Sequence, residues 1–356
     1  MKKVAASLIL LSLLGVVAWI YLDGPIREVH YRFHESGIDR FADTAEPMRI
    51  ALIADIHLRE TARGEITAEQ QTRAIIASFI DSMNNDVKPD FIVQLGDLND
   101  GCGESCAKLS SDAEIIARLE RARQYTRDET GIPWFDVIGN HEYASAYRPD
   151  LSVIEDKDYS AIYQAIDEDW SKLEDTWYLR DIKGYRFIFL NTAYPNPGRS
   201  HRIPEGQIAW LEAALKATER PVFVFMHVPV SAGAGNTYDV AVGQDEVIDL
   251  LSRHDRFVAG FFGHSHHSDK WDGLRRQVDH AGNVYFHVPA PHQWMGDPSS
   301  HPWVIVDIEP GNDGFTVEVG SGVRRSEMAQ FGYYLKETLV KLPRRLMTRV
   351  LSLIAG

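Results

Sequence analysis

Short apolar runs, rich in β-branched and aromatic residues, alternate along the chain with longer stretches of mixed character. Such runs predict buried β-strands, whereas apolar residues spaced three or four positions apart predict amphipathic helices. We expect helices at Ile66–Met83, Ser111–Tyr125 and Glu205–Ala217, and strands at Arg49–Asp55, Phe91–Val93, Trp134–Gly139, Arg186–Asn191, Val222–Val228, Phe257–Phe262, Asn283–Val288 and Val304–Ile308. This order predicts an α/β domain with a largely buried sheet and a more β-rich C-terminal half.

The first segment of the chain is apolar enough to cross a membrane. Val4–Leu22 contains no charged residue, and Lys2 and Lys3 precede it. At about 1.5 Å per helical residue, a segment of this length nearly spans a hydrocarbon core of about 30 Å. We therefore expect an uncleaved transmembrane anchor at residues 1–23, with the lysines on the cytoplasmic side. A cleaved signal peptide is the alternative, because Val16–Ala18 offers a small-residue cleavage site.

The C-terminal tail carries a second amphipathic pattern. Apolar residues recur three or four positions apart between Phe331 and Leu353, with Pro343 as a kink. From Arg324 onward, basic residues outnumber acidic ones. We expect a basic amphipathic helix within residues 323–356, which lies either on a bilayer surface or against the domain.

Composition and charge limit the classes of function. The chain has 356 residues, of which 44% are hydrophobic and 25% are charged, as expected for a globular protein with a substantial core. Its formal net charge is −14. This charge argues against binding to a nucleic-acid backbone, which requires a basic surface.

Two cysteines, Cys102 and Cys106, lie close together in the sequence GCGESC. Outside the cytoplasm this pair could close a small disulfide loop, whereas two cysteines alone make a poor structural zinc site. A disulfide is the favoured interpretation, and two free thiols are the alternative.

Side chains suited to metal binding follow directly on five of the predicted strands. They are Asp55 and His57, Asp97 and Asp100, Asn140 and His141, His227, and finally His264 and His266. Residues two apart in an extended segment point the same way, so the first pair can converge on one ion. Because ligands of α/β sheets gather at the carboxyl ends of strands, the five sites are expected to form one cluster.

These residues, in this order, resemble the signature of the calcineurin-like metallophosphoesterases: D-x-H, G-D, G-N-H-D/E, H and G-H-x-H. All five blocks are present between about Arg49 and Trp271. The resemblance implies a four-layer α/β/β/α sandwich, here at residues 49–322, with two divalent metal ions at the strand ends. It implies one ion on Asp55, His57 and His266, a second on Asn140, His227 and His264, and Asp97 as the bridge. Such donors suit Mn²⁺, Fe or Zn²⁺ without deciding among them.

The resemblance also implies a mechanism. A hydroxide that bridges the two ions attacks the phosphorus in line, with no covalent enzyme intermediate. His141, which the family does not use as a ligand, is the candidate for protonating the leaving oxygen. Asp100 matches the family position that orients this histidine. A structural imidazole is the alternative role for His141.

Departures from the family pattern bear on the substrate. Protein Ser/Thr phosphatases continue the second block as G-D-x-x-D-R-G, but here Asp100 is followed by Gly101, so the phosphate-gripping arginine is missing. The forms QLGD and GNHEY resemble the branch that hydrolyses ADP-ribose and CDP-alcohols, although that branch commonly has Gln at the position of His57. We expect hydrolysis of a phosphodiester or diphosphate linkage. The alternatives are a phosphomonoesterase or protein phosphatase of the same superfamily, or an inactive membrane-bound binding protein.

Some side chains outside the signature are weaker candidates for substrate contacts. They are Tyr143, Tyr147 and Arg148 after the GNHE block, and Arg199, His201 and Arg202 in the loop Tyr194–Arg202. Such a loop often rims an α/β site, but it is equally typical of a solvated connection. We do not expect metal ligands among His287, His292 and His301, which lie near Trp294.

The two ends of the chain together predict its location. An anchor followed by a connector at residues 24–48 places the catalytic domain on the periplasmic side of the inner membrane, as a single-pass protein. A tail helix on the bilayer would favour a membrane-linked substrate. Membrane anchorage also resembles the UDP-diacylglucosamine diphosphatases of lipid A synthesis. Those enzymes usually work on the cytoplasmic side, which conflicts with this topology.

Overall fold

The computed structural model describes residues 31–36, 45–60, 66–67, 70–100, 111–127, 130–143, 159–166, 175–196, 201–230, 241–266, 274–291, 303–311 and 314–321. All of them fall within one compact unit, Val29–Gly322. The predicted anchor, both cysteines and the predicted tail helix lie outside the described residues. Among the described helices, none is long and apolar enough to cross a membrane.

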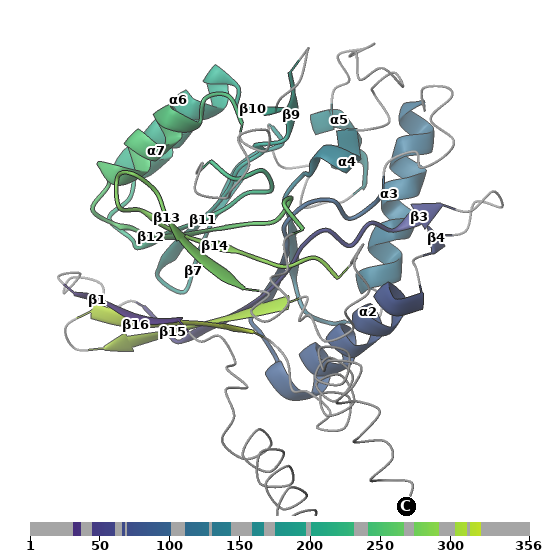
Figure 1. The fold of residues 1–356 in the computed structure, drawn as a ribbon, viewed down its shortest axis with the longest axis horizontal. Helices are drawn as coiled ribbons and strands as arrows, with labels where there is room; N and C mark the ends of the chain where they lie inside the picture. The colour runs from purple at the N-terminus through teal and green to yellow at the C-terminus, as the bar shows by residue number, and fades with distance from the viewer. Residues whose placement is uncertain are drawn as a thin grey trace, which may run out of the picture. The chain divides into compact units, whose positions relative to one another are not determined.

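Two mixed six-stranded sheets form the frame of the described unit (Figure 1). The first has the strand order β1 (Tyr31–Ser36), β16 (Gly314–Ser321), β15 (Trp303–Gly311), β2 (Met48–Ile53), β5 (Phe91–Gln94) and β6 (Trp134–Asp136). The second has the order β13 (Arg275–Val278), β14 (Val284–His287), β12 (Phe257–Phe262), β11 (Val222–Phe225), β8 (Tyr185–Phe189) and β7 (Tyr178–Ile182). Two short ribbons pair β3 (Arg59–Glu60) with β4 (Ile66–Thr67), and β9 (Tyr194–Pro195) with β10 (His201–Arg202).

Aromatic and aliphatic side chains fill the space between the two sheets. Phe91 of β5 packs edge-on against Phe187 of β8, with ring centroids 5.1 Å apart. Ile50 and Leu52 of β2 belong to the same buried core. Because side chains alternate between the faces of a strand, Ile53 points to the opposite face of the first sheet, where it is also fully buried. The first sheet is therefore covered on both faces.

Helices pack against each sheet. The chain contributes α2 (Gln70–Ser82), a π-helical turn η1 (Met83–Val87), α3 (Asp112–Arg127), α4 (Asn140–Tyr143), α5 (Tyr159–Ile166), α6 (Glu205–Lys216) and α7 (Gln244–Ser252). Phe79 of α2 lies edge-on to Trp134 of β6 and Trp303 of β15, at 5.9 and 5.6 Å. On the second sheet, Arg186 of β8 donates a hydrogen bond to the Ala214 carbonyl of α6 at 2.7 Å.

Figure 1 shows α6 and α7 together at the second sheet, and α2 and α3 at the first. This arrangement is consistent with the metallophosphoesterase sandwich.

The direction of the strands determines where the site forms. Strands β2, β5 and β6 run parallel in the first sheet, and β8, β11, β12 and β14 run parallel in the second. The carboxyl ends of parallel strands meet at one edge of a sheet. The predicted site residues follow β2, β5, β6, β11 and β12, so both sheets contribute to one place.

The α/β class predicted from the sequence is confirmed, with differences at particular elements. Helix α2 begins at Gln70 instead of Ile66, because Ile66 and Thr67 pair with β3. Residues 31–36 of the expected connector form β1, which pairs antiparallel with β16. The ring of Phe33 on this strand stacks on Phe286 of the second sheet, at 6.2 Å. Part of the expected connector thus belongs to the sandwich.

Helix α3 shows how local sequence sets an element boundary. Ser111 donates its backbone N–H to the Glu114 carboxylate at 2.7 Å. The hydroxyl oxygen of Ser111 accepts the backbone N–H of Glu114 at 3.3 Å. This reciprocal pair is a capping box, which satisfies backbone donors that would otherwise lack acceptors. The helix accordingly begins at Asp112.

Candidate metal centre

Three overlapping groups of histidines and aspartates lie at the carboxyl ends of the strands. Within each group, the potential ligand atoms lie no more than 4.8 Å from one another. The groups are Asp55, His57, Asp97 and His266; His57, Asp100 and His141; and Asp97, His227 and His264. Shared members join them into one cluster. The cluster combines residues that follow the first sheet with residues that follow the second.

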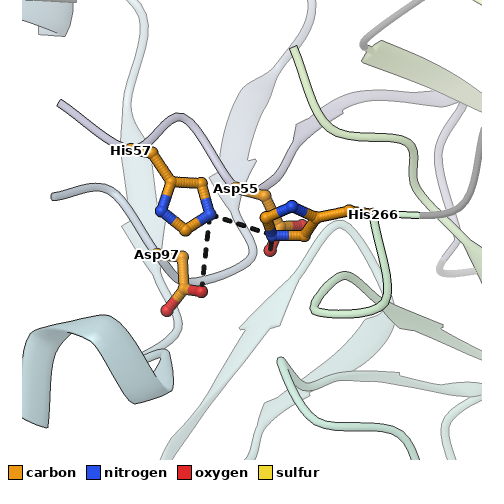
Figure 2. Close-up of side chains that lie close together, drawn as sticks. All are labelled: Asp55, His57, Asp97 and His266. Atoms are coloured by element: carbon orange, nitrogen blue, oxygen red, sulfur yellow. Dashed lines mark hydrogen bonds and ion pairs between the residues drawn. The ribbon is translucent and has the colours of Figure 1, made fainter. Parts of the chain in front are cut away.

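Figure 2 shows the first group, in which Asp55, His57, Asp97 and His266 face a common point. Nε2 of His57 lies 2.9 Å from Nε2 of His266, and Nε2 of His266 lies 3.1 Å from Oδ1 of Asp55. Two imidazole nitrogens this close can share one proton or bind one cation. Neutral imidazole nitrogen and carboxylate oxygen are both common ligands of divalent metals.

Asp97 lies at the centre of the cluster. Its side chain is fully buried, and Oδ1 accepts the backbone N–H of His141 at 2.8 Å. Oδ2 accepts no hydrogen bond from the described residues. Instead it faces three imidazole Nε2 atoms: His227 at 3.2 Å, His57 at 3.7 Å and His141 at 3.9 Å. A buried oxygen surrounded by potential ligands, with no donor, fits a metal ion.

Asn140, His227 and His264 form the other side of the cluster. The amide oxygen of Asn140 lies 3.0 Å from Nε2 of His227 and 2.8 Å from Nδ1 of His264. Nδ1 of His227 donates to the carbonyl of Leu95 at 2.7 Å. Because Nδ1 carries a proton, displacement of the Nε2 proton by a metal ion would leave a neutral ring whose Nε2 lone pair faces Asp97 and Asn140. This second contact is the usual way in which proteins fix a metal-binding tautomer.

Asp100 connects two histidines to an arginine. Its Oδ1 lies 3.2 Å from Nδ1 of His57 and 3.2 Å from Nδ1 of His141. Its Oδ2 accepts a hydrogen bond from Nε of Arg59 at 2.8 Å. His141 is more exposed than His57, at 34% against 3% of the side chain. It therefore lies on the solvent side of the cluster.

The backbone around the cluster is strained. Asp55, His57, Asp97, His264 and His266 all have φ between 48° and 67°, a region that non-glycine residues rarely adopt. Such conformations cost on the order of 1 to 3 kcal/mol each and persist only where the surrounding structure fixes them. Five of the seven described non-glycine residues with positive φ lie in this one cluster.

Glycines in the signature allow the strands to approach one another. A Cβ atom on Gly139 would lie 2.2 Å from Oδ1 of Asp97, and one on Gly263 would lie 2.6 Å from Oδ2 of Asp55. Both distances are well inside van der Waals contact, and the first involves the central carboxylate. The G-N-H and G-H-x-H blocks therefore require glycine on steric grounds alone.

Glu142 holds two of the loops together. Its buried carboxylate accepts the backbone N–H groups of Gly139 at 2.7 Å, Asp97 at 2.9 Å and Asn99 at 3.2 Å. Burial and the neighbouring charge of Asp97 raise the pKa of Glu142 to about 7. The sequence pattern by itself gave Glu142 no separate role, although the residue belongs to the GNHE block.

Mutual attraction between carboxylates and imidazoles dominates the charges of the cluster. Burial alone would lower the pKa of His227, but Asp97 outweighs it and raises the value to about 9. Burial would also lower the pKa of His141, but Asp97 and Asp100 outweigh it and raise the pKa to about 9. Burial would raise the pKa of Asp55, whereas His266 lowers it to about 2. In the metal-free protein at neutral pH, Asp55 is thus charged, and His141 and His227 are protonated.

The structure brings together all nine predicted site residues, which are Asp55, His57, Asp97, Asp100, Asn140, His141, His227, His264 and His266. His201 of β10 joins them from the rim loop, with its ring 5.3 Å from that of His264. Burial and the charge of His264 lower its pKa to about 4. Tyr143 is buried and its hydroxyl accepts a hydrogen bond from Asn191, so it supports the core.

Other candidates lie away from the cluster or outside the described residues. His287 is buried in β14, with its ring centroid 5.4 Å from that of Phe262, and belongs to none of the three groups. Tyr147, Arg148, Arg199, His292, Trp294 and His301 lie outside the described residues.

The sequence matches the family described as calcineurin-like phosphoesterase over residues 48–268. This match covers most of the chain and contains every member of the cluster. The chain belongs to the calcineurin-like phosphoesterase family. The metallophosphoesterase resemblance inferred from the five motif blocks is thereby confirmed.

Two curated relatives are distant. A probable glycerophosphodiester phosphodiesterase from Arcobacter nitrofigilis is 21% identical over 62% of this chain and 72% of its own length. A manganese-dependent ADP-ribose/CDP-alcohol diphosphatase from Xenopus laevis is 23% identical over 51% of this chain and 62% of its own length. Among solved structures, a dimetal phosphatase from Danio rerio superposes with a TM-score of 0.53 at 16% identity, covering 78% of this chain and 98% of that chain. This similarity supports the fold.

The proton content of the cluster predicts how metal affinity depends on pH. A metal ion must displace the protons held by His227 and His266, whose pKa values are raised. Each displaced proton should strengthen apparent binding about tenfold per pH unit below the imidazole pKa. We expect Mn²⁺ to bind at least about 100-fold more tightly at pH 8 than at pH 6.

Titration calorimetry in two buffers of different ionisation enthalpy would measure both the affinity and the protons released. Equal affinities at the two pH values, with no proton release, would show that the imidazoles are not the groups displaced.

Proposed function

We propose that this protein is a dimetal phosphoesterase that hydrolyses a phosphodiester or diphosphate linkage. The observation that carries the proposal is the buried Asp97 carboxylate, which both halves of the cluster share. Family membership supports the reaction class. The acidic net charge of the chain, −14, also fits a site that needs cations to attract an anionic substrate.

The proposed ligand set follows the two halves of the cluster. Asp55, His57 and His266 would hold one ion, and Asn140, His227 and His264 the other. Asp97 would bridge them, which its position between the two halves supports. Two bound divalent ions would supply a water of lowered pKa and positive charge for the phosphoryl oxygens. Mn²⁺, Fe and Zn²⁺ all suit these donors.

His141 is proposed to protonate the leaving oxygen. Its Nδ1 lies 3.2 Å from Oδ1 of Asp100, and its Nε2 faces the centre of the cluster, 3.9 Å from Oδ2 of Asp97. Its raised pKa keeps the imidazole protonated at neutral pH, as a general acid requires. Asp100 holds the ring and stabilises its charge.

Two independent observations support the proposed type of bond. One relative is named as a glycerophosphodiester phosphodiesterase and the other as a diphosphatase. In both kinds of substrate the phosphate that is attacked carries a second substituent, either an alcohol or another phosphate, besides its terminal oxygens. The sequence also lacks an arginine directly after Asp100, where protein Ser/Thr phosphatases have one. A phosphomonoesterase is the second candidate, since the same metals would serve it. A protein that binds metal without catalysis is the third.

We further propose that the domain is anchored at the periplasmic face of the inner membrane. The apolar segment Val4–Leu22 after two lysines supports this placement. If the basic tail also rests on the bilayer, a lipid-linked substrate becomes accessible.

Reporter fusions test this location. We expect alkaline phosphatase fused after Gly356 to be active, because that reporter folds only after export. A silent fusion, together with an active cytoplasmic reporter at the same position, would place the domain in the cytoplasm.

Hydrolysis is expected to depend on metal and on Asp97. The protein loaded with Mn²⁺ should cleave bis(p-nitrophenyl) phosphate and lose this activity in the presence of a chelator. Asp97→Asn should lower metal content and reduce activity by at least about 100-fold, because one carboxylate serves both ions. Asp307→Asn, which removes a carboxylate paired with Arg49 away from the cluster, is the matched control. A metal-replete wild type inactive on a broad phosphoester panel would favour the binding-protein alternative.

His141→Ala should separate catalysis from metal binding. We expect kcat to fall by about 10² to 10⁴ while the metal content stays the same, because the imidazole acts on the leaving group. His254→Ala serves as the control, since His254 is half-buried and belongs to none of the three groups. Loss of metal from His141→Ala, measured by elemental analysis, would show that this histidine is a ligand.

A substrate panel should distinguish the linkages. We expect kcat/KM to be highest for nucleotide diphosphates, phosphodiesters or lipid-linked phosphates, and lowest for phosphopeptides. The panel should include ADP-ribose, glycerophosphodiesters, cyclic nucleotides and a phosphoserine peptide at equal metal loading. A preference for the phosphopeptide would overturn the proposed substrate class.

A further inference from the structure

Arg59 reaches the cluster from a position outside the five signature blocks. It lies in β3, two residues after His57. The backbone there is fixed to the loop after β5, since Leu58 donates its N–H to the Leu98 carbonyl at 2.9 Å and Asp100 donates its N–H to the Leu58 carbonyl at 2.8 Å. The main chain next to Arg59 is therefore held against the loop that carries Asp100.

Asp100 fixes the orientation of this guanidinium. Nε of Arg59 donates to Oδ2 of Asp100 at 2.8 Å, while Oδ1 faces His57 and His141. Only Nε of Arg59 has a hydrogen-bond acceptor among the described residues. The side chain is 45% exposed, so its terminal nitrogens are accessible to a ligand.

Asp100 takes up only the Nε donor of the Arg59 guanidinium. The remaining N–H groups of the guanidinium can therefore donate to an additional anion. A guanidinium that is held through Nε presents its two terminal NH₂ groups in one plane, which matches two phosphate oxygens. Since Asp100 already orders the side chain, binding a phosphate would cost little further conformational entropy.

We propose that Arg59 is a phosphate-binding residue of this site and contacts a phosphoryl oxygen of the substrate. This inference rests on the proposed phosphoesterase function and deepens it. The second block of the sequence lacks an arginine after Asp100, and the tertiary structure brings an arginine to Asp100 from the segment after the first block. The positive group thus comes from a different strand. Arg59 shares Asp100 with His141, the residue proposed to protonate the leaving group.

Arg49 provides a closely matched control for Arg59. Its Nε donates to Oδ1 of Asp307 at 2.6 Å, and its side chain is 47% exposed, against 45% for Arg59. Arg49 lies near the start of β2, whereas the cluster follows the end of that strand. Removing either arginine deletes one arginine–aspartate pair. Only one of the two pairs adjoins the cluster.

The test measures anion binding to the metal-loaded protein without turnover. Calorimetry would compare inorganic phosphate and imidodiphosphate, a non-hydrolysable diphosphate, for the wild type, Arg59→Ala, Arg59→Lys and Arg49→Ala. We expect Arg59→Ala to weaken binding of at least one anion by about 10- to 100-fold, since a hydrogen bond to a charged group is lost. Arg59→Lys should restore part of the affinity, and Arg49→Ala should change it less than about twofold.

The two anions distinguish the phosphate that Arg59 contacts. If Arg59→Ala weakens the binding of both anions, Arg59 contacts the reacting phosphoryl group. If it weakens the binding of imidodiphosphate alone, Arg59 contacts a neighbouring phosphate. Unchanged affinity for both, with a lower kcat or a shifted pH–rate profile, would show that Arg59 only positions Asp100 and would overturn the proposal. If Arg59→Ala loses metal, Arg59→Gln, which keeps a donor for Asp100, gives the same comparison.

The outcome is separable from the proposed function. Anion binding and metal content are measured directly, so the role of Arg59 is decided even if no hydrolysable substrate has been found. Conversely, if the wild type binds phosphate through Arg59 but hydrolyses no substrate, the proposed role of Arg59 is supported and the proposed activity is overturned.

Discussion

The burial of a charged carboxylate at the meeting point of the two sheets is the constraint on which the rest of the site depends. Asp97 is completely buried, and moving an isolated carboxylate out of water costs several kcal/mol even after the protein relaxes. The structure compensates with one backbone N–H and three imidazoles. These partners come from three strand ends, because His141 supplies both the N–H and one of the imidazoles. Satisfying this single group therefore fixes the relative positions of several loops.

Those loops are held by main-chain contacts as much as by side chains. Glu142 gathers three backbone N–H groups from the loops after β5 and β6. The backbone N–H groups of Asp55 and His57 donate to the carbonyls of Gly96 and Asp97 at 3.0 and 2.9 Å. This bonding holds the positive φ values of the cluster against their conformational cost. The sandwich supplies the rigid frame, and the strain is confined to the ends of its strands.

The metal cluster and the side chains next to it come from different parts of this architecture. The cluster lies at the ends of the central parallel strands and within the family motif. Arg59 and His201 adjoin it from β3 and β10, which are short elements. Relatives at 21% and 23% identity differ from each other in the names of their substrates. Specificity is therefore to be sought in this surrounding set, where the proposed role of Arg59 can be tested.

The sequence alone determined the elements and the chemistry of the cluster. Apolar runs ending in Asp, His or Asn predicted strands that deliver ligands, because a strand buried on both faces needs such a run. The motif order then predicted that the nine site residues converge, and the structure brings them together. Glycine at 139 and 263 belongs to the same motifs, and its steric reason became visible only with neighbouring atoms in place.

Only the tertiary structure decided which side chains from outside the motifs join the site. Arg59 carries no local signal, since an arginine after a strand is an ordinary surface residue. His201 was only a weak candidate, since its loop was equally typical of a solvated connection. Their distances to Asp100 and His264 depend on the pairing of separate strands. The same holds for β1. Its polar sequence at residues 31–36 is typical of a connector, and it forms a strand by pairing with β16. Local patterns fix local conformation, whereas contacts between distant segments depend on the packing of the whole sandwich.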